Sequence, residues 1–221
     1  MKTKLMKVVM LSLSVFLFSS CNEEILQQII DSEYTAKESL QQVMNVAKTD
    51  FAPDAKLAMI YGLNVNQKGE INLKKPTETV FVYAIQSDSK QETALYVPVF
   101  GAGPVRSPIG FNDMLGLIKD QTAAQTMGTV FGLLSSVAIS ASAQYDDSPW
   151  AVSKALANTH GAAFVNANPS YKIDLYLIPS KTLSFAGVID GADWIVNLKS
   201  GNQSLVLWIN SGTGIVSKIS G

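Results

Sequence analysis

The order of apolar and polar positions predicts that the first half of the chain folds as a helix followed by strands. Apolar residues recur every three or four positions over 36–48, which predicts an amphipathic helix. Three later runs alternate or are rich in β-branched and aromatic residues, and they predict strands: 56–65, 79–85 and 93–100. Glycine-containing turns are expected at 66–69 and 101–104.

The second half repeats this order of elements. Asp147-Ser148-Pro149 predicts the start of a helix, with Ser148 as the N-cap and Pro149 at the first helical position. The helix is expected to end at Gly161. Five strands are expected after it: 171–178, 183–189, 193–199, 204–210 and 215–219.

A less regular segment, 105–146, connects the two halves. Its part over 111–118 predicts a short helix. Residues 127–141 are apolar but contain many Gly, Ser and Thr residues, a composition that does not suit a membrane span. We interpret 127–141 as a buried connection, and the alternative is a surface for an apolar ligand.

These patterns predict the α+β class, with two small domains that each lay a helix on an antiparallel sheet. The first domain is expected over 36–104 and the second over 147–221. Corresponding positions in the two halves lie about 110 residues apart, for example Lys56-Leu57 and Lys172-Ile173. We interpret this spacing as a duplication, although a helix followed by strands is also a common order in unrelated domains.

The first twenty residues have the three zones of a secretory signal peptide. Lys2, Lys4 and Lys7 form a positive start, an apolar run follows, and small residues precede the expected cleavage site. The apolar run has eleven positions, whereas a spanning helix needs about 20 residues. We therefore expect a signal peptide over 1–20 and no permanent transmembrane anchor.

Cys21 identifies the type of signal. The segment Phe18-Ser19-Ser20-Cys21 resembles the bacterial lipobox, although Phe18 stands where leucine is usual. The resemblance implies a lipoprotein with lipid on Cys21, and several acyl chains on one residue hold a protein stably at a membrane. Asp does not follow the cysteine, so we expect the outer membrane, with residues 21–35 as a polar tether.

Charge and cysteine content restrict the possible functions. Without residues 1–20 the chain has 14 basic and 18 acidic residues, a net charge near −4. It lacks the basic face that nucleic-acid binding requires. Cys21 is the only cysteine in the chain, so no intramolecular disulfide can form, and the fold depends on packing.

The end of the chain carries a family resemblance. A short helix, alternating strands, Trp194 and the turn Asn210-Ser211-Gly212-Thr213-Gly214 together resemble the PepSY type of domain. Its final strand commonly ends in an Asp-x-x-Thr-Gly turn, and Asn210 stands in the Asp position. The resemblance covers 147–221 well and 36–103 weakly. It implies a fold similar to β-lactamase-inhibitor proteins, a non-catalytic extracytoplasmic module, and a role in restraining proteases.

Candidate catalytic and metal-binding residues are few, and we predict no catalytic residue, cofactor or metal ligand. His160 is the only histidine, and its expected place at a helix C-terminus favours a capping role. Asp146-Asp147 and the pair Asp190 and Asp193 lack the spacing of a calcium loop and are expected to be solvated turn carboxylates. The tryptophans 150, 194 and 208 are expected in the core.

The sequence favours a lipid-anchored envelope protein that binds an unknown protein or peptide without catalysis. This hypothesis predicts an exposed sheet edge or face. Two alternatives stay open. A hydrolase that uses carboxylates requires a cleft with two acidic groups about 5–10 Å apart, and a carrier of an apolar ligand requires an apolar cavity near 127–141.

Overall fold

The computed structural model describes residues 33–76, 78–99, 101–108, 138–180 and 188–221. The predicted signal peptide, Cys21, the expected helix over 111–118 and most of the predicted strand over 183–189 lie outside these ranges. Residues 33–221 form one compact unit. Its elements in chain order are β1 (Glu33–Tyr34), α3 (Leu40–Asp50), β2 (Lys56–Val65), β3 (Ile71–Asn72), β4 (Val80–Ser87), β5 (Glu92–Val99), β6 (Gly103–Arg106), β7 (Ala138–Gln144), α6 (Ser148–Ala157), α7 (Thr159–Ala167), β8 (Lys172–Pro179), β9 (Val188–Ser200), β10 (Gln203–Ile209) and β11 (Val216–Ser220).

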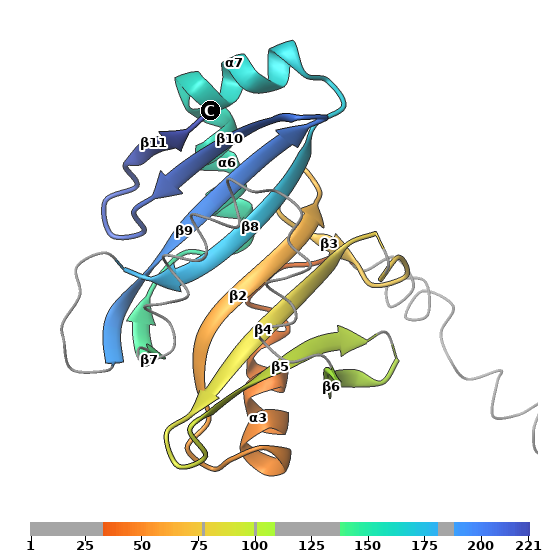
Figure 1. Ribbon diagram of the computed structural model, residues 1–221, viewed down its shortest axis with the longest axis vertical. Helices are drawn as coiled ribbons and strands as arrows, with labels where there is room; N and C mark the ends of the chain where they lie inside the picture. The colour runs from red at the N-terminus through yellow and green to blue at the C-terminus, as the bar shows by residue number, and fades with distance from the viewer. Residues whose placement is uncertain (1–32, 77, 100, 109–137, 181–187) are drawn as a thin grey trace, which may run out of the picture. The chain divides into compact units, whose positions relative to one another are not determined.

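One large sheet contains nearly all of the strands (Figure 1). Its order is β11-β10-β9-β8-β2-β4-β5-β6, with antiparallel neighbours throughout. β7 lies off this path and pairs with β9 in parallel. β1 and β3 form a separate two-stranded sheet. The α+β class is therefore confirmed.

The two predicted domains do not have separate sheets. β2 from the first half pairs with β8 from the second half, with Tyr61 opposite Tyr176. Both strands are buried along most of their length, so neither half could end its sheet there without exposing an apolar edge. The segments 36–104 and 147–221 consequently supply two halves of one continuous sheet.

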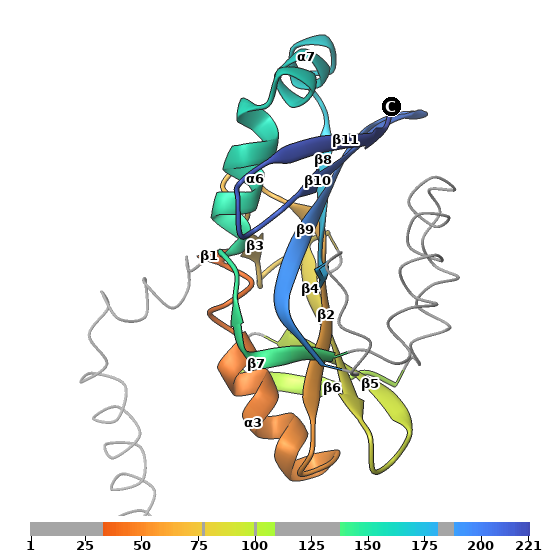
Figure 2. The same cartoon turned by 90° about the vertical axis from the view of Figure 1, so that its left-hand side faces the viewer.

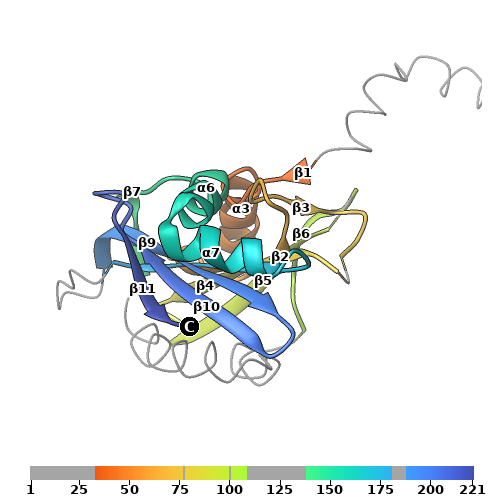
Figure 3. The same cartoon turned by 90° about the horizontal axis from the view of Figure 1, so that it is seen from above.

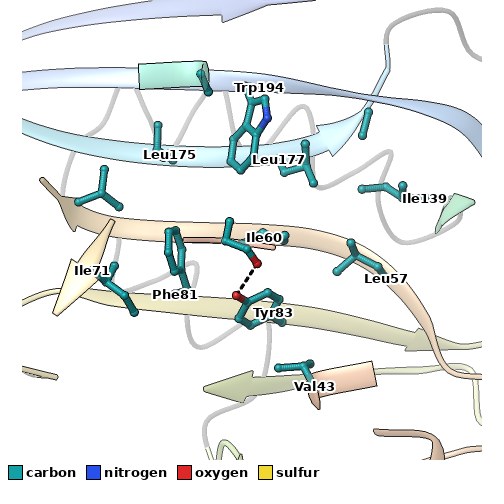
Figure 4. Packing of buried hydrophobic residues seen from close by; sticks show 14 of the residues in the cluster. Val43, Leu57, Ile60, Ile71, Phe81, Tyr83, Ile139, Leu175, Leu177 and Trp194 are labelled. Atoms are coloured by element: carbon teal, nitrogen blue, oxygen red, sulfur yellow. Dashed lines mark hydrogen bonds between the residues drawn. The ribbon is translucent and has the colours of Figure 1, made fainter. Parts of the chain in front are cut away.

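All three described helices lie on the same face of the large sheet (Figures 2 and 3). They cover a core that contains Val43 from α3 and Trp194 from β9, both with no exposed surface. Figure 4 shows this core, including the bond from the Tyr83 hydroxyl to the Ala36 carbonyl at 2.8 Å. Within the described ranges, no helix is both long and apolar enough to cross a bilayer.

A second apolar cluster lies on the opposite face of the sheet. It contains Met59, Ile178, Ile195 and other buried side chains. Its centre is the stacked pair Tyr61 and Tyr176, whose ring centroids are 5.0 Å apart. Alternation along β8 thus sends Leu175 and Leu177 to the helix side and Tyr176 and Ile178 to the other, as predicted.

The predicted helix boundaries in the second half are wrong at both ends. Asp147 is the N-cap of α6 instead of Ser148, and its carboxylate accepts from the Ser148 N–H at 2.7 Å. Pro149 therefore occupies the second helical position. The Ser148 hydroxyl instead accepts from the Ala36 N–H at 3.0 Å, so this capping region joins the two halves of the fold.

The helix predicted to end at Gly161 is in fact two helices, α6 and α7. The break is at Asn158, whose side-chain oxygen accepts from the His160 N–H at 3.0 Å and caps α7. Gly161 lies inside α7, where a Cβ atom would stand 1.9 Å from the Ala155 carbonyl oxygen. This glycine permits close packing of α7 on α6 and does not end a helix.

Four of the described strands were not predicted: β1, β3, β6 and β7. Gly101 has a positive φ of 72° and Gly103 one of 75°, so the chain reverses there and returns along β5 as β6. The end of the predicted apolar connection, residues 138–141, belongs to β7. The tether expected over 21–35 overlaps a strand, because Glu33–Tyr34 forms β1.

Candidate functional site

The sheet edge at β11 is the most exposed apolar feature of the described residues. Ile215 is 62% exposed and Ile219 is 40% exposed. Val216 between them packs against the helix-side core, so alternation along the strand turns Ile215 toward the opposite face. Trp208 in the neighbouring strand is partly buried and belongs to that opposite face.

The predicted turn before β11 positions this edge. The side-chain oxygen of Asn210 accepts from the N–H and the hydroxyl of Thr213, each at 2.9 Å. The Gly214 N–H donates to the Asn210 carbonyl at 2.8 Å, and Gly214 has a positive φ of 69°. Asn210 thus holds the turn through both its side chain and its backbone carbonyl.

The backbone of β11 presents hydrogen-bonding groups at the open edge. The Asn210 N–H donates to the Ile215 carbonyl at 3.0 Å, which makes these two residues a hydrogen-bonded pair. In an antiparallel ladder the next pair, Ile209 and Val216, is then a non-bonded pair. The N–H and C=O of Val216 consequently point away from β10. In the part of the chain that the structure describes, β10 is the only strand that pairs with β11.

The opposite edge of the sheet, at β6, is built differently. The Ser107 N–H donates to the Leu95 carbonyl at 2.7 Å, and this bond fixes which β6 residues face β5. Because hydrogen-bonded and non-bonded pairs alternate, Val105 is hydrogen-bonded to β5, and the backbone groups of Pro104 and Arg106 point outward. Pro104 has no N–H, and proline at this position protects an edge from pairing. The two edges therefore differ in their capacity to accept another strand.

The three tryptophans have different environments. Trp194 is fully buried, as predicted, and its indole N–H donates to the Asp146 carbonyl at 2.9 Å. Trp150 is only partly buried, at the margin of the core. Trp208 faces the opposite side from Leu205 and Leu207, as its position in the strand predicted, and it lies opposite Ser217 of β11.

The predicted acidic pairs have structural roles. Asp193 is 1% exposed, and its carboxylate accepts from the Trp208 indole at 3.2 Å and from the Ser211 N–H at 3.0 Å. Asp147 caps α6 and also accepts from the Lys37 N–H at 3.0 Å. The prediction of solvated turn carboxylates is therefore wrong for these two residues, whereas Asp146 and Asp190 are exposed. No metal-binding cluster of His, Cys, Asp or Glu occurs among the described residues.

His160 lies at the start of α7, so the predicted C-terminal capping role is wrong. Its side chain is exposed at a groove of about 550 Å³ between α7 and the ends of β10 and β11. Ser204 and Ser220 line the same groove, whose described lining includes no Asp or Glu side chain. The groove therefore lacks the third, acidic member of a Ser-His-Asp arrangement.

A second groove of about 610 Å³ lies between α3, the start of β2 and β7. Its floor is largely apolar, and its rim carries Lys37, Lys48 and Lys56. Tyr145 also lines the groove, and burial together with nearby Asp147 raises the pKa of its hydroxyl to about 12. The described lining contains no pair of carboxylates of the kind a glycoside hydrolase uses.

Sequence reasoning found the β11 turn but not the exposure of the strand after it. The alternation of apolar and polar residues over 215–219 does not distinguish an edge strand from a central strand, so the exposure of this strand could not be predicted. Residues 139–141, from the segment considered for an apolar ligand, line the groove beside α3. The wall from α3 and the lysines of the rim were not predicted, because these segments lie about 90 residues apart in the sequence. Comparison with known proteins adds no relative: no family profile, curated protein or solved structure matches the chain.

Proposed function

We propose that this chain is a lipid-anchored protein of the cell envelope that binds extended protein or peptide segments by strand addition at β11. The outer membrane is the proposed location, and lipid on Cys21 is the proposed attachment. In this proposal the protein performs no catalysis. The PepSY-like resemblance adds envelope proteases as a partner class that the protein restrains.

The observation that carries this proposal is the open edge of β11. A strand can be added where an edge offers outward N–H and C=O groups, and exposed side chains beside them give affinity. Val216 supplies the backbone groups, and Ile215 and Ile219 supply the apolar contacts. The strand contains no proline, in contrast to β6 with Pro104, and its pairing with β10 is regular over Val216–Lys218 and shifts register at Ile219.

Crosslinking in intact cells tests the proposal. A photoreactive amino acid at Ser217, which is exposed at the middle of β11, is expected to capture a partner identifiable by mass spectrometry. The double change Ile215→Glu and Ile219→Glu is expected to abolish capture, because it places two charges where apolar contacts are needed.

The β6 edge supplies a matched control. Val105 in β6 is 42% exposed and Val99, at the end of the adjacent β5, is 40% exposed, so their change to glutamate introduces the same charges on a comparable surface. This control is expected to leave capture at Ser217 unchanged. Equal loss of capture in both double variants, or no captured protein in the wild type, would reject strand addition at β11.

We also propose that the two halves arose by duplication. Within the large sheet, α3 is followed by β2, β4, β5 and β6, and α6–α7 is followed by β8, β9, β10 and β11; β3, between β2 and β4, belongs to the small sheet. The sheet order places these two series symmetrically on either side of the β2–β8 pair. Duplication predicts that 36–104 superposes on 147–221 with strands matched in chain order, and a best superposition that reorders them would contradict it.

A further inference from the structure

The groove beside α3 has the dimensions and lining of a small-molecule site. Its volume of about 610 Å³ falls within the range of about 300–1,000 Å³ that such sites occupy. α3 and β7 both lie on the helix side of the sheet (Figure 2), and residues of both line the groove. The eleven-residue helix gives the groove a wall about 16 Å long at 1.5 Å per residue.

α3 carries two rows of apolar side chains, one facing the core and one facing the groove. Val43 and Ala47 are fully buried in the core below the helix. Leu40 and Met44, one turn apart, are only partly buried, and both line the groove. An apolar side chain left partly exposed along a concave surface leaves a contact area that an apolar ligand can cover.

The wall opposite α3 continues this apolar surface. Leu57 and Ile139 are almost fully buried and form its floor. β7 is paired with β9 through residues at its two ends, 138, 139 and 144, with a register irregularity between them. The middle of β7, with Ala141 and Ala143, consequently forms the side of the groove with small side chains.

The charge of the rim has one sign. Lys48 stands in the last turn of α3, and Lys56 begins β2. Lys37 donates to the Tyr145 carbonyl and lies 4.4 Å from the centre of the Tyr145 ring. The described lining includes no Asp or Glu. Lys56 pairs with Asp88 at 2.5 Å, and Asp88 lies outside the lining.

We propose that this groove binds a long-chain anionic amphiphile of the fatty-acid class, with its carboxylate at a rim lysine and its chain along α3 and β7. A neutral apolar ligand would not use the lysines, and a small hydrophilic anion would not use the apolar floor. This site is separate from the β11 edge, and it would exist whether or not the proposed strand addition occurs.

A photoreactive palmitic acid with a diazirine in its chain is a direct probe. With the full chain in nanodiscs, ultraviolet crosslinking followed by mass spectrometry is expected to place the label on peptides from α3 and β7. The matched photoreactive alcohol has the same chain without the carboxylate, and it is expected to label these peptides less, by up to about fivefold, the upper end for one exposed ion pair. Equal labelling by the acid and the alcohol would overturn the proposal.

Two variants distinguish binding in the groove from non-specific adsorption of the fatty acid to the protein surface. Lys48→Glu is expected to reduce labelling by the acid, by up to about fivefold, and Met44→Trp is expected to reduce it as well, because the larger side chain narrows the groove. Lys172→Glu makes the same charge change at an exposed residue of β8, outside the lining, and is expected to have no effect.

Lys48 is exposed, so its variant tests the site without disturbing the core. An equal effect of Lys48→Glu and Lys172→Glu would overturn the proposal. So would label distributed over the whole chain, or displacement of the label by an acidic peptide but not by unlabelled palmitate. None of these outcomes depends on binding at β11, so the two proposals fail separately.

Discussion

Asp174 holds together the junction between the two halves of the sheet, and its removal tests that role. It lies in β8 opposite Asn197 of β9, with 4% of its side chain exposed. One carboxylate oxygen accepts from Lys199, and the other accepts from the Asn64 N–H at 3.0 Å. Asn64 has a positive φ of 47° and lies in the irregular part of the β2–β8 pairing.

The expected cost of Asp174→Ala follows from these contacts. Removing one partner of a buried ion pair costs about 3–5 kcal/mol, much of it from the charge that is left behind. Lys199 keeps 24% of its side chain exposed, so its ammonium group can regain water. We therefore expect the free energy of unfolding to fall by about 3 kcal/mol, at the lower end of that range.

Urea denaturation of the full chain, followed by tryptophan fluorescence, measures this change. Asp88→Ala is the matched control, because Asp88 pairs with Lys56 at 2.5 Å but is 59% exposed. An exposed pair contributes about 1 kcal/mol or less. If Asp174→Ala lowered the free energy of unfolding no more than Asp88→Ala, the ion pair would not stabilise the junction.

Three further predictions concern other parts of the chain. Cys21→Ser is expected to move the protein from the detergent phase to the aqueous phase in phase partitioning, and unchanged partitioning would contradict lipid attachment. His160→Ala is expected to change the free energy of unfolding by less than about 0.5 kcal/mol, because the side chain is exposed; a fluorophosphonate probe that labels the wild type but not this variant would instead reveal catalysis. Bonds from the Ser89 N–H and from the hydroxyls of Ser87 and Ser89 lower the pKa of Asp54 from 3.8 to about 2. This lowered pKa stabilises the fold above pH 3.8, and the contribution is lost as pH falls toward 2. Asp54→Asn should therefore destabilise the protein at neutral pH but not at pH 2, as measured by urea denaturation at both pH values.

The sequence correctly predicted elements that depend mainly on residues near to one another in the chain. The strand over 56–65 was predicted with the bounds of β2, because its apolar run is closed by the Asn66–Gly69 turn. The side-chain alternation of β8 was also correct. The cap of α6 was missed by one residue, since Asp147 and Ser148 are both good caps, and only the contact of Ser148 with Ala36 distinguishes them.

The remaining features depend on contacts between distant residues. Ile60 pairs with Leu177, more than a hundred positions away in the sequence. The residue pattern of each strand does not identify its partner strand, so this pairing could not be predicted. Gly161 resembles a helix stop in sequence, but its function is to let α7 approach the Ala155 carbonyl. The candidate edge also depends on such pairing, because only the strand order shows that β11 is terminal.

The backbone amide of Val216 tests strand addition most directly. Hydrogen exchange measured by NMR on the full chain should find this amide rapidly exchanging in the free protein, because it points away from β10. With the crosslinked partner bound, strand addition predicts strong protection of Val216, while the Ser217 amide, already directed at β10, changes little. A bound partner that leaves the Val216 amide in rapid exchange would contradict strand addition at this edge.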